Sequence, residues 1–325
     1  MKNILSDIKN NNLKRMYLLM GDEAYLKHQY FLKLRDAVGA SDSNINVSLF
    51  EGKNIDVGAL IDTAETLPVF ADRRVVFIRN SGFFKDANEK FTSYMEDPAE
   101  STMFVFCEDE VDKRSKLYKT VNAKGYVCEF NILREDELLQ WIGSVLKKEN
   151  RKISGDTARL LLDRTGFDMN QIKAELEKLI AYTDGSDVVT AEDVEAVCSR
   201  ALSDDIFKLI NAASEKNRKK VFEFYSDLYA LRVSPVKIIA VLGTTYLRLL
   251  RIKELRREGK PESEIAKILG MNPYVVKKYG ISLKNVGRQT LYDNLTMCAE
   301  ADEAFKSGLM TDWLCLETLL VKLCS

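Results

Sequence analysis

Short, almost wholly apolar runs alternate with helical patterns over the first 130 residues, and this feature constrains the fold most. Runs without polar alternation are typical of strands buried on both faces of a parallel sheet. Two helices, over residues 22–38 and 57–66, separate the first three runs, which indicates right-handed β-α-β crossovers. The sequence therefore predicts a three-layer α/β domain with a five-stranded parallel sheet, its strands over residues 15–20, 47–50, 75–78, 103–107 and 126–130.

Beyond Phe130 the strand patterns stop and only helical patterns continue. An amphipathic helix is predicted over residues 135–149, and a capping box opens another at Thr190. Ser234 followed by a proline predicts the start of a long helix that ends near Glu258. We therefore expect an α/β domain followed by two all-α domains, with boundaries at residues 1–139, 140–204 and 205–325.

The composition excludes several classes of protein. Lys and Arg number 48 against 49 Asp and Glu, so a surface that is basic overall and wraps nucleic acid is excluded, although a local basic face is not. The six cysteines form no C-x-x-C pair and there is one histidine, so zinc-ligand spacing is absent and reduced core cysteines are expected. No run reaches the roughly 18 apolar residues of a membrane span. We expect a cytoplasmic protein without membrane contact.

The first strand, Gly21 and the following helix have the order of a phosphate-binding P-loop. That motif requires G-x-x-x-x-G-K-[ST], whose glycines let backbone N–H groups approach the phosphates. Here Leu26 stands at the second glycine position, two acidic residues follow Gly21, and Lys27 precedes His28 instead of a serine or threonine. The sequence favours a nucleotide-type scaffold that holds no nucleotide. A divergent nucleotide site is the alternative.

The remaining sequence shows no other catalytic motif. Acidic residues 108–110 follow the fourth strand, where a magnesium-binding acidic pair would lie, but they stand beyond the apolar run. His28 has no second histidine as a partner, and no G-x-S-x-G elbow occurs. We therefore predict no catalytic, cofactor-binding or metal-binding residue, while carboxylates that the fold brings together stay an open possibility.

Residues 66–80 place three apolar side chains, Leu67, Val69 and Phe70, at a proline-marked turn between a helix and a strand. Connections lie on the surface and meet water, so apolar residues in them are unusual. Such side chains either fold back onto the core or fill a pocket of another protein. The sequence alone favours the second alternative, because no other functional element was found.

Two further segments carry positive charge. The end of the long helix, residues 248–260, holds six basic residues that could contact DNA phosphates or simply lie in water at a helix C-terminus. Residues 264–278 read as helix, glycine turn and helix, like a DNA-reading helix-turn-helix. The second helix begins with Pro273, Tyr274, Val275 and Val276, which favour burial over a groove. We interpret both segments as parts of a helical bundle.

Several segments together give the chain a family resemblance. The chain resembles, over its whole length, the delta-subunit family of bacterial DNA polymerase III, which includes the clamp-opening subunit of the clamp loader. The order and spacing of the segments agree throughout. They are residues 17–23, 67–76, 112–118, 175–179, 206–209 and 265–278.

The resemblance implies an AAA+-like fold: an α/β domain, a small helical lid and a helical collar that oligomerises. It implies a subunit without a working nucleotide site or catalytic residues of its own, within a DNA-directed DNA polymerase holoenzyme. Its implied partners are the sliding clamp (beta), the delta-prime and tau/gamma subunits of a hetero-oligomer, and primer-template DNA. An active AAA+ ATPase and a helix-turn-helix regulator, reading DNA through Lys277 and Lys278, are the alternatives.

The family's clamp-binding residues carry over to the turn. The family's Leu-Phe pair corresponds to Val69 and Phe70, with Leu67 behind them, and its frequent glutamine falls on Glu65. Valine keeps the apolar plug but shortens it, and glutamate changes a polar contact. The sequence leaves open whether Arg73 and its neighbour at 74 touch the clamp or anchor the following strand.

Overall fold

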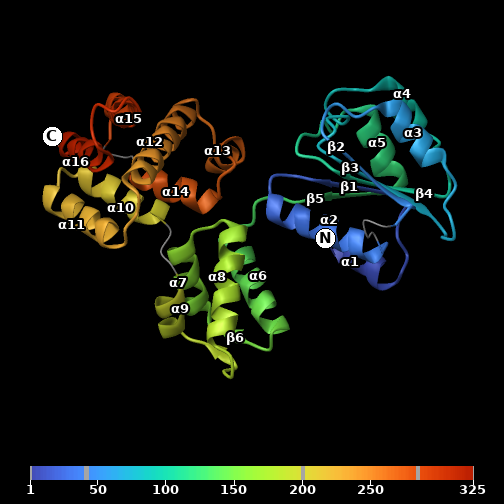
Figure 1. The fold of residues 1–325 in the computed structure, drawn as a ribbon, viewed down its shortest axis with the longest axis horizontal. Coiled ribbons are helices and arrows are strands. Elements are labelled where there is room, and N and C mark those ends of the chain that lie inside the picture. Colours follow the sequence, from blue (N-terminus) through green and yellow to red (C-terminus); the bar gives the residue numbers. More distant parts are fainter. Residues whose placement is uncertain (1, 40–43, 199–201, 283–285, 325) are drawn as a thin grey trace. The chain divides into compact units, whose positions relative to one another are not determined.

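The computed structural model describes residues 2–39, 44–198, 202–282 and 286–324. The chain divides into two compact units, Met1–Ile132 and Leu133–Ser325 (Figure 1). The first unit contains the sheet and the second is helical, as the sequence predicts.

The first unit contains a five-stranded sheet in which every neighbouring pair is parallel and the strand order is β2-β3-β4-β1-β5. The three central strands are almost wholly buried, whereas the edge strands are partly exposed, because only central strands have neighbours on both sides. The predicted parallel sheet is confirmed. Its strands are β1 (Met16–Met20), β2 (Val47–Glu51), β3 (Arg74–Arg79), β4 (Thr102–Cys107) and β5 (Tyr126–Glu129).

Helices cover both faces of this sheet, which gives the predicted three layers (Figure 1). Phe31 packs against Phe77 on the face that carries α1 and α2, with ring centroids 5.1 Å apart. Phe91 packs against Phe106 on the face that carries α3, α4 and α5. Helices α1, α4 and α5 were not predicted: α1 and α4 have only eight and six residues, and α5 is mostly polar. The helices are α1 (Lys2–Lys9), α2 (Ala24–Ala37), α3 (Val57–Glu65), α4 (Glu89–Tyr94) and α5 (Lys116–Lys124).

The beginning of the second unit is helical, with the predicted capping box at Thr190, which exchanges hydrogen bonds with Asp193. The expectation of purely helical structure after Phe130 missed one feature: a parallel pairing between β6 and β7, each two residues long. Two residues are too few for a strand pattern. The elements are α6 (Glu135–Lys148), β6 (Lys152–Ile153), α7 (Gly155–Thr165), α8 (Met169–Tyr182), β7 (Val188–Val189) and α9 (Ala191–Val197).

The rest of the second unit is a bundle around α12, which begins at Pro235 as predicted, although the Ser234 side chain makes no capping hydrogen bond. Helix α12 contacts five of the other helices, and residues such as Tyr246 and Ile252 are fully buried. The division of this unit into lid and collar at residue 204 stays a prediction. The helices are α10 (Leu202–Ser214), α11 (Arg218–Ala230), α12 (Pro235–Arg257), α13 (Glu262–Leu269), α14 (Pro273–Ser282), α15 (Arg288–Lys306) and α16 (Asp312–Leu323).

All six cysteines are free thiols and buried, as predicted for core residues. Burial raises the pKa of the Cys107 thiol to about 11 and that of Cys298 to about 12, because an apolar surrounding disfavours the thiolate. Across the described ranges, no helix is both long and apolar enough to cross a membrane.

Candidate functional site

Residues 66–73, which we call the tip, connect α3 to β3. Phe70 is fully exposed, and the exposed fractions of Leu67 and Val69 are 74% and 43%. The three apolar side chains therefore do not fold back onto the core. Of the two alternatives that the sequence allowed, folding back onto the core is not observed, and the exposed side chains are accessible to another protein.

The tip backbone has one residue in an uncommon conformation. Thr66 is extended, with φ −65° and ψ 123°, and this ends α3. Phe70 has φ 52°, in the left-handed region that bulky L-residues rarely adopt. Such a conformation costs about 1–3 kcal/mol and persists only where the surroundings hold it.

Two buried polar side chains hold the tip. The Asn46 amide donates to the Val69 carbonyl oxygen at 2.8 Å and accepts from the Val69 N–H at 2.7 Å. The Arg74 guanidinium donates to the carbonyl oxygens of Thr66 at 2.8 Å and Ile45 at 3.2 Å. Both side chains lie beneath a loop that is itself exposed.

The two arginines at the end of the tip have different surroundings. Arg74 is buried and its guanidinium is used by loop carbonyls, so it anchors the strand and the tip. Arg73 is exposed, and its guanidinium donates to the Leu13 carbonyl oxygen at 3.4 Å. Arg73 is thus the one of the pair whose side chain is exposed to solvent.

Glu65, at the position of the family's glutamine, interacts inside its own unit. Burial raises the pKa of Tyr94 to about 12, and a hydrogen bond to Glu65 contributes to the same direction. This contact ties the last residue of α3 to the last residue of α4. Glu65 therefore has a structural contact as well as its place before the tip.

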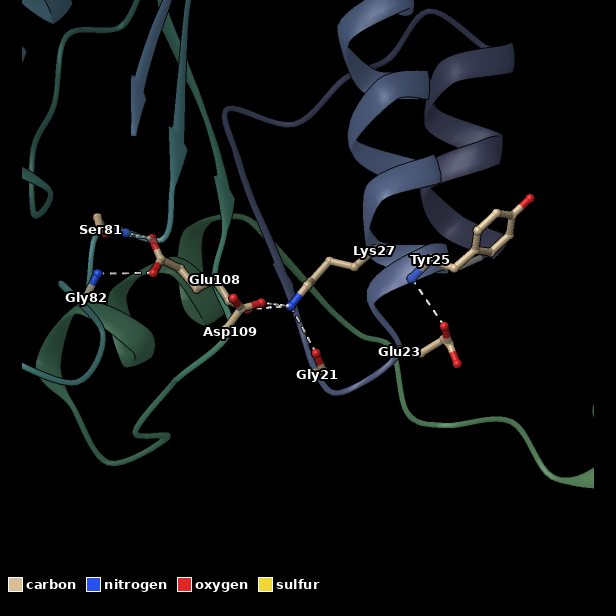
Figure 2. Close-up of polar contacts among 8 residues, drawn as sticks. All are labelled: Gly21, Glu23, Tyr25, Lys27, Ser81, Gly82, Glu108 and Asp109. Atoms are coloured by element: carbon tan, nitrogen blue, oxygen red, sulfur yellow. Dashed lines mark hydrogen bonds and ion pairs between the residues drawn. The ribbon is translucent and has the colours of Figure 1, made fainter. Parts of the chain in front are cut away.

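The lysine of the P-loop-like segment is bound by the protein itself (Figure 2). Lys27 is buried, and its ammonium group donates to the carbonyl oxygens of Gly21 at 3.0 Å and Glu108 at 3.2 Å. It also forms an ion pair with Asp109. The charge that would contact a phosphate is therefore paired with a carboxylate, and two carbonyl oxygens accept hydrogen bonds from the same ammonium group.

The acidic residues after β4 are engaged as well. Glu108 is 1% exposed and accepts hydrogen bonds from the Ser81 N–H at 3.0 Å, the Ser81 hydroxyl at 2.5 Å and the Gly82 N–H at 3.2 Å (Figure 2). Burial nonetheless raises the pKa of Glu108, because it outweighs the stabilising hydrogen bonds. Glu110 pairs with Lys85. Each of the three acids thus has a partner within the protein.

The start of α2 also differs from a phosphate cradle. The Glu23 carboxylate accepts from the Tyr25 N–H at 3.2 Å, so a negative side chain already caps the helix (Figure 2). Gly21 has φ 111°, and a Cβ there would lie 2.3 Å from the Phe130 carbonyl oxygen. The nearby backbone of Phe130 therefore requires a glycine at position 21. In the described ranges, no group of three or more His, Cys, Asp or Glu residues could hold a metal.

The basic end of α12 is interleaved with carboxylates. Glu254 pairs with Arg251 at 3.3 Å and with Arg288 at 3.0 Å. Arg256 pairs with Glu262 at 2.6 Å, and further along Lys260 pairs with Glu264. These ion pairs favour the interpretation of a solvated helix end over a DNA-binding surface.

The helix-turn-helix-like segment consists of α13, Gly270 and α14, as the sequence predicts. Val276 and Tyr279 on α14 are buried in the core of the second unit. The Tyr279 ring stacks on Phe207 with centroids 4.5 Å apart. Helix α14 thus packs into the bundle through part of its surface.

Comparison with known proteins decides the family. Residues 17–131 match the family described as DNA polymerase III, delta subunit, and residues 203–323 match its C-terminal domain. This chain belongs to the DNA polymerase III delta-subunit family. The chain is 25% identical to the DNA polymerase III subunit delta of Bacillus subtilis (strain 168), over 98% of this chain and 96% of that protein.

Other members of the delta-subunit family agree over most of their length. The probable DNA polymerase III subunit delta of Aquifex aeolicus (strain VF5) is 22% identical over 92% of this chain and 88% of that protein. The structure of the Bacillus subtilis DNA clamp loader delta protein superposes with a TM-score of 0.82 at 25% identity, over 99% of each chain. The predicted fold class, an AAA+-like α/β domain followed by helical domains, is confirmed.

Asn46 of this delta-family chain was not among the predicted site residues. Its distance in sequence from Val69, 23 residues, leaves no local pattern that would reveal the contact. A polar residue immediately before an apolar strand is common and carries no signal by itself. The predicted residues Leu67, Val69 and Phe70 do lie together on one exposed segment.

Proposed function

We propose that this chain is the clamp-loader subunit that binds and opens the sliding clamp for loading onto primed DNA during replication. The observation that carries the proposal is the anchored tip, which exposes Leu67, Val69 and Phe70. Clustered apolar side chains on a held loop suit a protein pocket. The structural similarity to a DNA clamp loader delta protein supports the same role.

The proposed mechanism is mechanical and not catalytic. Phe70 and Val69, with Leu67 behind them, fill a hydrophobic pocket of the clamp. A buried aromatic anchor at the centre of an interface contributes about 2–4 kcal/mol. If the tip binds the strained, open form of the ring more tightly than the closed form, this difference in affinity opens the ring.

Partner subunits hydrolyse ATP in this proposal, and this chain does not. The support is the set of contacts that uses Lys27, Glu108 and Asp109 within the protein. A nucleotide would have to displace these contacts before its phosphates could reach the ammonium group.

We therefore expect equilibrium dialysis of the purified chain with labelled magnesium-ATP to show no retained nucleotide. The Lys27→Met variant is the matched control, because a divergent nucleotide site would lose affinity when its lysine is removed. Retention by the natural chain that disappears in Lys27→Met would establish the ATPase alternative instead.

The proposed partners follow from the family. Residues 205–325 would form the collar that joins the delta-prime and tau/gamma subunits in a hetero-oligomer, with residues 140–204 as the lid. Primer-template DNA would be bound by the assembled complex. Because bacterial DNA is replicated in the cytoplasm, the proposed function places the chain there.

The proposal predicts that the purified full-length chain binds the sliding clamp without ATP. Since the tip is exposed in the chain alone, no nucleotide-driven change is needed to present it. Biolayer interferometry with immobilised clamp, with and without magnesium-ATP, measures this directly. Equal affinity in both conditions is expected. Binding that appears only with ATP, or no binding in either condition, would refute the proposal.

A helix-turn-helix regulator is less well supported. A groove-reading helix needs polar residues free to meet base edges. In α14, Val276 and Tyr279 are instead buried, and the Lys278 ammonium lies 5.5 Å from the centroid of the Phe207 ring. Of the two lysines that such a regulator would use, one is thus engaged inside the bundle.

A further inference from the structure

We propose that Asn46 and Arg74 are positioning residues that hold the tip in its binding conformation before the clamp arrives. This inference rests on the proposed clamp-binding function. It concerns residues that would not touch the clamp pocket themselves, because both are buried beneath the tip.

Asn46 connects the middle of the tip to the sheet. Its amide makes both available hydrogen bonds of Val69, at 2.7 Å to the N–H and at 2.8 Å to the carbonyl oxygen. The backbone carbonyl oxygen of Asn46 accepts from the Val75 N–H at 2.8 Å, which continues the pairing of β2 with β3. Val69 is therefore fixed to the sheet edge through a single side chain.

Arg74 closes the two ends of the tip. Its N–H donates to the Ser101 carbonyl oxygen at 2.8 Å, so its backbone belongs to the sheet. Its guanidinium reaches back to the Thr66 carbonyl oxygen at 2.8 Å, where α3 ends. The guanidinium also reaches Ile45, next to Asn46. The first residue of β3, Arg74, thus binds the residue that follows α3, Thr66.

Phe70 follows directly after the residue that Asn46 holds, and it has φ 52°. A strained conformation survives where surrounding contacts determine the backbone, and such conformations cluster at functional sites. A loop that only joined α3 to β3 would need neither a buried amide nor a buried cation. Holding the loop in advance removes the entropy cost of ordering it on binding, which raises affinity without a new contact.

The test compares Asn46→Ala with Asn272→Ala in the full-length chain. Asn272 is the matched control, because it is also buried, donates to the Leu133 carbonyl oxygen at 2.7 Å and accepts from the Tyr274 N–H at 2.9 Å in the other unit. We expect Asn46→Ala to weaken binding to the sliding clamp by about tenfold. We expect Asn272→Ala to leave clamp affinity unchanged.

Hydrogen exchange gives a readout that does not depend on the clamp. The Val69 amide, whose N–H is held by Asn46, is expected to exchange faster in Asn46→Ala and not in Asn272→Ala. Urea unfolding of both variants corrects for any difference in global stability. Asn46→Asp is measured alongside: it keeps the size and the acceptor for the Val69 N–H but places a carboxylate oxygen against the Val69 carbonyl oxygen, so it should weaken clamp binding as the alanine variant does. Asn46→Ala with natural affinity, or with slow tip exchange despite weak binding, would overturn the inference.

The outcomes separate this inference from the proposed function. If the natural chain fails to bind the clamp, the proposed function is wrong and the positioning role falls with it. If the natural chain binds and Phe70→Ala does not, the function stands. The affinity of Asn46→Ala then decides the positioning role by itself.

Discussion

Replacing Phe70 with alanine is expected to weaken binding to the sliding clamp by about 30- to 700-fold. The range follows from the 2–4 kcal/mol that a central aromatic anchor contributes, with about 1.4 kcal/mol for each factor of ten. Phe70 is fully exposed in the chain alone, so the ring makes no contribution to the core that the substitution would remove. The fold should therefore keep its free energy of unfolding within about 0.5 kcal/mol.

The measurement is an equilibrium titration of the clamp with the full-length chain, without nucleotide. Tyr292→Ala is the matched control, because Tyr292 is an exposed aromatic residue on α15 in the other unit. Urea unfolding of both variants checks that the fold is intact. Binding by Phe70→Ala as tight as that of the natural chain would show that the site has been assigned to the wrong residues.

The two departures from the family's motif differ in their surroundings. Val69 is less exposed than Phe70 and its backbone is bound by Asn46, so part of its role is to fix the tip. Glu65, which stands where the family often has glutamine, interacts with Tyr94 of the same unit. Of the three apolar residues, Phe70 has the largest surface to lose to a pocket.

The sheet was predictable because its three central strands are apolar over nearly their whole length. A strand that is buried on both faces has apolar residues at consecutive positions, and this pattern can be read from a short stretch of sequence. Helices α1, α4 and α5 were not predictable in the same way, since α1 and α4 have only eight and six residues and α5, although as long as α3, is mostly polar. Their formation depends on packing against the sheet, as Phe91 of α4 does against Phe106.

The tip was recognisable as unusual from its apolar residues, but its exposure was not. Whether a loop folds back depends on contacts that are distant in the sequence. Asn46 lies 23 residues from Val69, and Arg74 reaches 29 residues back to Ile45. No local pattern encodes these hydrogen bonds, so the anchored conformation could only be seen in the fold.

In the P-loop-like segment, too, some features were visible in the sequence and others only in the fold. The sequence revealed that the second glycine and the hydroxyl residue are absent. It did not reveal where Lys27 goes, because Asp109 is 82 residues away and joins it only through the pairing of β1 with β4. The structure adds a reason why the lysine is retained: it satisfies the carbonyl oxygens of Gly21 and Glu108 beneath the strand ends.

Gly21→Ala is expected to lower the free energy of unfolding by about 3 kcal/mol or more. Two effects add: a positive φ of 111° strains any L-residue, and the new Cβ would lie 2.3 Å from the Phe130 carbonyl oxygen. That carbonyl cannot move freely, because Phe130 donates to the Met20 carbonyl oxygen at 2.7 Å and accepts from the Glu23 N–H at 2.9 Å.

Gly52→Ala is the matched control for this prediction. Gly52 has φ 90°, but a Cβ there would meet nothing within 4 Å, so only the backbone strain of about 1–2 kcal/mol is expected. Urea unfolding of both variants measures the difference, which isolates the clash with Phe130. If the two variants lost equal stability, steric contact would not explain the glycine. A larger loss in Gly21→Ala than in Gly52→Ala would mean that glycine is needed at position 21 because the Phe130 backbone approaches it closely, and not because of a phosphate.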